Sequence, residues 1–334
     1  MRADVRALNP MQETCLQLSR ESTTMEPEAA PMYGNCYAFP RLIGAMDLGL
    51  IRLGGAGLGN HLFTWARCLI QARRYGLKRI GATWPQFKRE PWMHHELDKR
   101  TYHDLFCRAQ DEVEPLHRLR LLATKRRVPE SQLGKEIPDG SIVVFEGFDG
   151  YLQPILAHRD LVRSELIAMV RDKHKGAIQA GFSPDIAIHV RLGDFLNADP
   201  VRGNSKLDIG WYAGILKGIR EQLGPLQAVI FSDGRDEEIA PLLAMEGVKR
   251  VSFGSSIADI LAMSQARILI TSGSTFSMWS SFLGQMPTVW FPKRLYHPIL
   301  PDPRRELSTY AEIPRTFVEQ CELSLASGNA RESA

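Results

Sequence analysis

The sequence lacks several features that would assign it at once to a familiar class of protein. Its five cysteines are odd in number and scattered, and no two of them form a Cys-x-x-Cys pair. This pattern predicts reduced thiols, with no disulfide framework and no structural zinc site. No apolar run approaches the roughly 20 residues that a membrane-spanning helix needs. The formal net charge of +3 is too small to indicate a nucleic-acid-binding protein.

The length and the overall composition are those of a globular protein with more than one core. The chain has 334 residues, of which 44% are hydrophobic and 24% charged, so two domains are expected. We predict an N-terminal domain over 46–178 and a C-terminal domain over 179–322. Residues 1–45 have no steady hydrophobic period and lack the order of a secretory signal, which predicts a disordered extension. Residues 323–334 are predicted to be a flexible tail.

The first half has an irregular pattern of elements. Helices are predicted at about 60–75, with Gly76 as the stop signal, at 115–127 and at 160–171. Short strands are predicted at 48–53, 79–83 and 142–145.

The second half alternates regularly between strand and helix. Strands are predicted at 185–190, 228–232, 248–253, 267–272 and 288–291, and helices at about 210–222, 235–245, 257–266 and 275–283. Such alternation predicts a parallel sheet with helices on both faces.

A glycine-rich turn, Gly54 to Gly59, lies between a predicted strand and a predicted helix. It could let a ligand approach the backbone at a helix start, or it could simply be a tight turn. The dinucleotide fingerprint G-x-G-x-x-G does not fit, because Ala56 or Asn60 stands where a glycine is needed, so an NAD oxidoreductase is disfavoured. No Gly-Lys-Ser/Thr follows either, which excludes a P-loop. Next to the turn, His61 is a candidate proton acceptor or an ordinary surface residue.

The strand predicted at 185–190 ends in polar residues of opposite charge. His189, Arg191 and Asp194 follow one another at nearly alternate positions. Ligands of parallel sheets bind at the carboxyl ends of strands, and a guanidinium there can hold a phosphate in two places. A buried ion pair is the alternative. Asp233, in the turn after the strand 228–232, is either a ligand contact or part of a plain loop.

The strand 267–272 runs into small hydroxylated residues that open the next helix. Ser272, Ser274, Thr275 and Ser277 lie within six positions, around Phe276. One hydroxyl suffices for an N-cap, so this number of hydroxyls favours a diphosphate at the helix start.

The basic stretch 116–127 is predicted to be an amphipathic helix, because its leucines recur at helical spacing among arginines and a lysine. It could rest on an anionic membrane surface, although such helices more often pack on their own protein.

Together these segments resemble the α-1,2-fucosyltransferase family, glycosyltransferase family 11. The family's G-G-L-G-N-Q-M-F is similar to residues 56–63, its H-V-R-R-G-D-Y to 189–195, and its F-S-D-D to 231–234. Its M-S…I-I-A-N-S-T-F-S-W-W is similar to Met263-Ser264 followed by 268–279. Among its departures from these motifs are His61, Leu192, Gly234, Gly273 and Met278.

The resemblance implies the GT-B fold, with two Rossmann-like domains that face each other across a cleft. It also implies transfer of fucose from GDP-fucose to a glycan hydroxyl, with inversion, no metal and no further cofactor. Arg191 takes the position of the family's essential arginine, and His61 and Asp194 are the candidate bases. The donor-binding residues are expected to be Gly59, Asn60, His189, Arg191, Asp233, Ser274, Thr275, Phe276 and Ser277.

Two other functions stay open: transfer from another GDP-sugar, and binding of a sugar nucleotide without catalysis. The expected partners are a nucleotide sugar and a glycan acceptor, and no nucleic acid is expected. Because no secretory signal or membrane anchor is recognised, we expect a cytoplasmic enzyme of surface-polysaccharide synthesis. It could lie at the inner face of the membrane, in contact with it through 116–127. The acceptor pocket is built from loops whose sequence does not name the acceptor.

Overall fold

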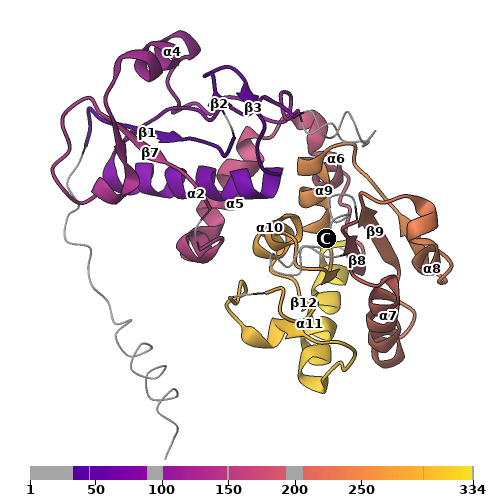
Figure 1. Cartoon of the computed structure of the whole chain (residues 1–334). Helices are drawn as coiled ribbons and strands as arrows, with labels where there is room; N and C mark the ends of the chain where they lie inside the picture. Colours follow the sequence, from indigo (N-terminus) through magenta and orange to yellow (C-terminus); the bar gives the residue numbers. More distant parts are fainter. Residues whose placement is uncertain are drawn as a thin grey trace, which may run out of the picture.

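The computed structural model has two lobes that follow each other along the chain, each built on a parallel sheet (Figure 1). It describes residues 33–44, 46–88, 101–148, 150–192, 206–295 and 297–332, with side chains as far as 327.

The N-terminal lobe contains a four-stranded sheet in the order β4-β1-β7-β6, in which all pairs are parallel. The strands are β1 (Tyr37–Pro40), β4 (Lys78–Arg79), β6 (Arg127–Pro129) and β7 (Ile142–Phe145). Every residue of β1 and β7 is buried. The prediction that residues 1–45 are disordered is therefore wrong for β1, which is an inner strand of this sheet. Four residues that end in a proline are too short a run for periodicity to reveal.

A second, small sheet has the order β2-β3-β5, with β2 (Met46–Asp47), β3 (Arg52–Leu53) and β5 (Gln86–Phe87). The prediction of a strand over 48–53 is confirmed only at its end, where residues 52–53 form β3, and the expectation that the whole run is buried is wrong. Leu48 and Leu50 are 55% and 66% exposed, and the hydrogen bond from Leu48 N to Ile51 O, 3.0 Å long, closes a turn between β2 and β3.

Three helices of this lobe agree with the predictions, and a short fourth one was not predicted. They are α2 (Leu58–Tyr75), α4 (Pro115–Thr124), α5 (Arg159–Met169) and the short α6 (Gly176–Gln179), with 3₁₀ turns at Glu130–Gln132, Gln153–His158 and Asp172–His174. Gly76 ends α2 in the left-handed conformation, at φ 68°, as the stop signal predicts.

The C-terminal lobe has a six-stranded parallel sheet in the order β10-β9-β8-β11-β12-β13. Its strands are β8 (Ile186–Val190), β9 (Ala228–Ser232), β10 (Val248–Arg250), β11 (Ile268–Thr271), β12 (Thr288–Trp290) and β13 (Glu306–Ser308). Numbered within the lobe, this order is 3-2-1-4-5-6, the doubly wound Rossmann order. The five strands predicted in this half are confirmed, and β13 was missed.

The helices of this lobe are α7 (Ile209–Leu223), α8 (Ala240–Leu243), α9 (Ser256–Met263), α10 (Thr275–Gly284) and α11 (Arg315–Glu332), with 3₁₀ turns at Asp236–Glu238 and Pro303–Arg305. The predicted flexible tail is wrong in part, because α11 continues through it. Ser324 on this helix is buried, and its hydroxyl donates a 2.7 Å hydrogen bond to the carbonyl of Arg267. Of the helices in the described ranges, none is long and apolar enough to cross a bilayer.

The two lobes share one apolar core, in which α2 and α5 pack against α10. Phe63 of α2 stacks on Trp279 of α10, with ring centroids 5.2 Å apart. The two helices therefore set how the lobes meet.

Candidate active site

Several of the polar residues predicted for the site gather where the strand order of the C-terminal sheet reverses. The chain passes from β8 to β9 and β10 on one side, and then continues at β11 on the other side. Ligands of doubly wound sheets bind at such a switch point, beyond the carboxyl ends of the strands. Residue 189, the last but one of β8, lies in register with Thr271, the last residue of β11, so the residues that directly follow the two strands lie side by side.

His189 lies at this point, 5% exposed. Its Nδ1 is 3.2 Å from the hydroxyl of Ser274, and its ring stacks on Phe276 with centroids 5.3 Å apart. Burial lowers the pKa of His189 to about 4; the nearby Asp233 opposes the shift and Arg191 adds to it. The ring is therefore neutral near pH 7. It can exchange a hydrogen bond with a bound ligand, but it adds no positive charge.

Arg191 is held in place by Asp233. The guanidinium Nη1 lies 2.6 Å from Asp233 Oδ2, and both side chains are about one quarter exposed, at 24% and 27%. The second carboxylate oxygen accepts a 2.8 Å hydrogen bond from the backbone N–H of Leu192. One carboxylate thus orients the guanidinium and fixes the backbone that carries it. Asp233, predicted as a donor-binding residue, acts here by positioning Arg191.

The start of α10 is the third part of the site. Ser274 is its N-cap, and its hydroxyl accepts a hydrogen bond from Ser277 N. Ser277 is 0% exposed and accepts a hydrogen bond from the Thr271 hydroxyl. The prediction that Ser277 contacts the donor is therefore wrong for this conformation, because its hydroxyl is used to bind the helix start to β11. Ser274 and Thr275 are only partly buried.

The glycine-rich turn of the N-terminal lobe reaches this same helix start. Trp279 Nε1 donates a 2.7 Å hydrogen bond to the carbonyl of Gly59. A Cβ at Gly59 would lie 2.8 Å from Thr275 Oγ1 and 3.0 Å from the carbonyl group of that residue. Only a glycine permits this approach. The starts of α2 and α10 therefore meet, as a site formed by both lobes requires.

Both helix starts are suited to an anion. Neither α2 nor α10 has an acidic residue in its first turn, and the first N–H groups of a helix carry partial positive charge. Asn60 lies in the first turn of α2, and its Oδ1 is buried without a hydrogen-bond partner among the described residues. A buried acceptor of this kind needs an explanation, and a ligand hydroxyl that donates to it is one.

His61 does not face this site. It is 0% exposed, and its Nε2 lies 3.1 Å from Arg52 Nη1 and 3.3 Å from Gln86 Oε1. Burial, and then the positive charge of Arg52, lower the pKa of His61 to about 3. The prediction that His61 is a catalytic base is wrong for this conformation, because an acceptor cannot reach the ring. Asp194, the other predicted base, lies outside the described residues.

Arg52 is the main residue of this region that the sequence analysis missed. It is fully buried, and it donates to the carbonyls of Thr83 and Ile43 at 2.6 and 2.8 Å. A Cβ at Gly55 would lie only 3.0 Å from Arg52 Nη1, so the guanidinium packs directly against the glycine-rich turn. The signal was present: a charged residue interrupts an apolar run just before the turn.

Tyr212 and Arg294 were also missed. Tyr212, on α7, is buried; burial raises its pKa, while the positive charge of Arg294 opposes this shift and the negative charge of Asp233 adds to it. Arg294 follows β12, and its Cβ would lie 2.5 Å from a Cβ at Gly273. Arg191 was noticed because it is a basic residue that follows a predicted strand. The same criterion could have indicated Arg294.

Two departures from the family pattern fit each other. Leu192 is 4% exposed, and a Cβ at Gly234 would overlap its side chain. Leu192 therefore occupies the space that a side chain at 234 would need, so an aspartate at 234 would not fit beside Leu192 as it lies here.

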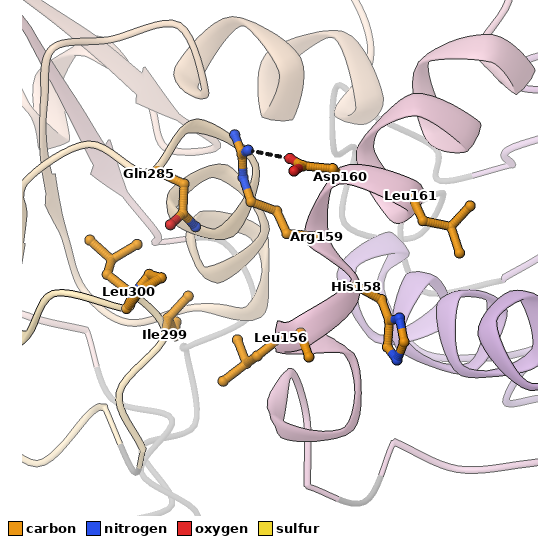
Figure 2. Close-up of a pocket in the computed structure, with 10 residues that line it drawn as sticks. Leu156, His158, Arg159, Asp160, Leu161, Gln285, Ile299 and Leu300 are labelled. Carbon is orange, nitrogen blue, oxygen red and sulfur yellow. Dashed lines mark hydrogen bonds and ion pairs between the residues drawn. The ribbon is translucent and has the colours of Figure 1, made fainter. Parts of the chain in front are cut away.

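A pocket of about 590 Å³ lies elsewhere, at the far end of α10 (Figure 2). Its lining contains Leu156–Leu161, Gln285 and Ile299–Pro301. Within it, Arg159 donates to the carbonyls of Phe282 and Leu283, and pairs with Asp160 at 2.7 Å. The guanidinium therefore caps the carboxyl end of α10. A ten-residue helix is about 15 Å long, so the pocket is separate from the site at the other end of α10.

No group of three or more His, Cys, Asp or Glu side chains that could hold a metal occurs in the part of the chain that the structure describes. The expectation that the reaction requires no metal stays a prediction.

Comparison with known proteins agrees with this arrangement. The model of glycosyl transferase family 11 matches residues 141–296, which include β8, β11 and the start of α10. The α-1,2-colitosyltransferase of Escherichia coli is 23% identical, over 82% of this chain and 99% of that protein. The resemblance to family 11 is confirmed.

Among solved structures, the Bradyrhizobium α-1,6-fucosyltransferase NodZ, soaked with GDP-fucose, superposes with a TM-score of 0.51 and 11% identity. The match covers 78% of this chain and 97% of NodZ. At this identity the likeness establishes the fold, which is GT-B as predicted.

Proposed function

We propose that this glycosyltransferase, whose residues 141–296 match the family 11 model, transfers fucose from GDP-fucose to a hydroxyl of a glycan. One observation carries the proposal: Arg191, fixed by Asp233, and the start of α10 lie beyond adjacent strands at the switch point of a Rossmann sheet. These groups suit the diphosphate of a sugar nucleotide. NodZ, which shares the fold, was soaked with GDP-fucose.

We propose a one-step displacement with inversion. The acceptor oxygen forms a bond to the anomeric carbon of fucose while the bond from that carbon to the β-phosphate oxygen breaks. GDP leaves with the electron pair, so negative charge grows on the β-phosphate. Arg191 and the N–H groups at the start of α10 would stabilise this charge, each by about 3 kcal/mol if they are preorganised. The bond from Asp233 supplies that preorganisation for Arg191.

The proton of the acceptor hydroxyl requires a base. His61 is fully buried in this conformation, where an acceptor cannot reach it. We propose Asp194, whose carboxylate follows Arg191 closely in the sequence. Asp194→Asn should lower kcat by about 100-fold or more, while GDP binding measured by calorimetry should persist.

Arg191→Ala tests the donor site. Turnover, measured as GDP released from GDP-fucose in the presence of acceptor, should fall by about 100-fold or more. Arg235→Ala is the matched control, because that arginine follows the neighbouring strand, β9, and its side chain is 81% exposed. Near-normal transfer by the Arg191 variant would reject the assignment. EDTA should leave activity unchanged, and a strict requirement for manganese would contradict the metal-free mechanism.

A second donor has a specific observation in its favour, the likeness to a colitosyltransferase. Leu192 and Gly234 also stand where the family motifs have an arginine and an aspartate, and we propose that donor choice depends on this change. Purified protein should therefore be offered GDP-fucose, GDP-colitose, GDP-mannose and UDP-sugars in parallel. The highest kcat/KM with GDP-fucose would support the first proposal, and the highest value with GDP-colitose would replace it by the second.

A further inference from the structure

The small sheet β2-β3-β5 exposes its apolar side chains and buries its polar ones. Strand register places Met46 opposite Leu53, and Leu53 opposite Phe87, so these three apolar side chains form one row across the sheet. They are 52%, 38% and 49% exposed. A sheet with one face in water usually turns its apolar residues inward, and here they point outward.

The polar residues occupy the buried face instead. The next row consists of Asp47, Arg52 and Gln86, of which Arg52 and Gln86 are almost fully buried. Gln86 accepts a hydrogen bond from Arg52, and both contact His61. A one-residue shift in register would bury the apolar row but expel Arg52 from its carbonyl partners. The network that supports the glycine-rich turn therefore fixes the apolar row on the outside.

The turn between β2 and β3 enlarges this apolar face. Leu48 and Leu50 at the turn are more than half exposed, and Ile51 is 38% exposed. Of the nine large hydrophobic residues that are exposed in the described part of the chain, six lie on β2, β3, β5 or this turn. Single exposed apolar residues are ordinary, but a contiguous group marks an interaction surface.

Helix α4 lies against this turn and adds positive charge. Arg118 donates to the carbonyl of Gly49, and a Cβ at Gly49 would lie 3.3 Å from a methyl group of Leu119. Figure 1 shows α4 and the β2-β3 hairpin on the same outer side of the N-terminal lobe. Leu116, at the start of α4, is 83% exposed. From 115 to 129 the sequence contains no acidic residue, and the exposed basic residues there are Arg120, Lys125, Arg126 and Arg127.

We propose that this face, the apolar row with its turn and the basic residues beside it, docks on an anionic lipid bilayer. Apolar side chains that insert at the headgroup boundary, next to lysines and arginines, are the two signals that make peripheral binding stable. The absence of acidic residues from 115–129 favours a negatively charged partner over a neutral apolar one. This membrane contact differs from the one predicted for 116–127 alone. Leu119 and Leu122 of α4 approach Gly49 in the turn between β2 and β3. The sheet and its turn, and not α4, therefore supply most of the exposed apolar side chains.

Vesicle co-sedimentation tests the proposal with the full chain. The protein should pellet with vesicles of phosphatidylcholine and phosphatidylglycerol, much less with phosphatidylcholine alone, and less as salt rises. The double variant Leu48→Ser/Leu50→Ser should weaken binding by about tenfold or more. Both side chains are exposed, so the fold should tolerate the change. Tyr310→Ser/Leu323→Ser is the matched control, because these residues are 64% and 63% exposed outside this face.

Three outcomes would overturn the proposal. They are no binding to anionic vesicles by the unaltered chain, equal binding by the turn variant and the control variant, and a turn-dependent dimer in light scattering with no vesicle binding. Transfer to an acceptor in solution should be unchanged in the turn variant, so failure of this inference is distinguishable from failure of the proposed function.

Discussion

Gly59→Ala tests whether the two lobes form one site. The added methyl group would meet Thr275 Oγ1 at 2.8 Å and the carbonyl group of Thr275 at 3.0 Å, whereas ordinary contact begins at 3.4 Å. The starts of α2 and α10 must therefore separate by about half an ångström. The carbonyl group is helix backbone and cannot rotate away as a side-chain end could.

We expect two measurable effects. Overpacking at this contact should lower the free energy of unfolding by about 1–3 kcal/mol in urea titrations. Displacing the start of α10 from the Arg191 side of the site should lower kcat, measured as GDP release, by about tenfold. Gly57→Ala is the matched control, because nothing lies within 4 Å of its added Cβ. Because Gly57 is the N-cap of α2, alanine there should lower the free energy of unfolding by less than about 1 kcal/mol.

A double-mutant cycle makes the test specific. Thr275→Ala removes the 2.8 Å contact but leaves the backbone contacts at 3.0 Å, so it should restore only part of the stability that Gly59→Ala loses. The reasoning is refuted if Gly59→Ala matches Gly57→Ala in both stability and turnover, because the two helix starts would then not be in contact.

Three further predictions concern the groups around the site. Asp233→Asn should lower kcat by about tenfold, because Arg191 loses its orienting partner, with little change in the urea midpoint; equal kcat would contradict the positioning role. His189 and His61 have pKa values lowered to about 4 and about 3 in the folded state. The unfolded chain thus binds more protons below pH 6.5, and stability should fall as pH drops from 6.5 towards 4, by up to about 3 kcal/mol per histidine. His189→Gln should flatten that slope, and an unaltered slope would contradict its buried, neutral state. Arg52→Met should lower the free energy of unfolding by about 3 kcal/mol, because buried carbonyls lose their donor; a loss under about 1 kcal/mol would show that the carbonyls find other partners.

The C-terminal lobe could be predicted closely from the sequence, for a physical reason. Strands of a parallel sheet covered on both faces are continuous apolar runs, and β8, β9 and β11 have this form. The strand-end rule then located His189, Arg191 and Ser274 correctly at the switch point.

The N-terminal lobe was predicted less well, because hydrophobicity alone does not say which face of a short strand is buried. β1 was missed as too short, and the run 48–53 was assigned to a buried strand although its four large apolar side chains are exposed. Which partner each polar residue meets also depends on tertiary contacts. His61 meets Arg52, and Asp233 meets Arg191, and neither pair has a sequence signal.

GDP binding to the unaltered chain and to Arg191→Ala, compared by isothermal titration calorimetry, tests the central claim most directly. If the guanidinium holds the diphosphate, the variant should bind GDP at least about tenfold more weakly, while guanosine, which lacks the phosphates, should show no such difference between the two proteins. Equal GDP affinity in the two proteins would contradict the placement of the donor at the switch point.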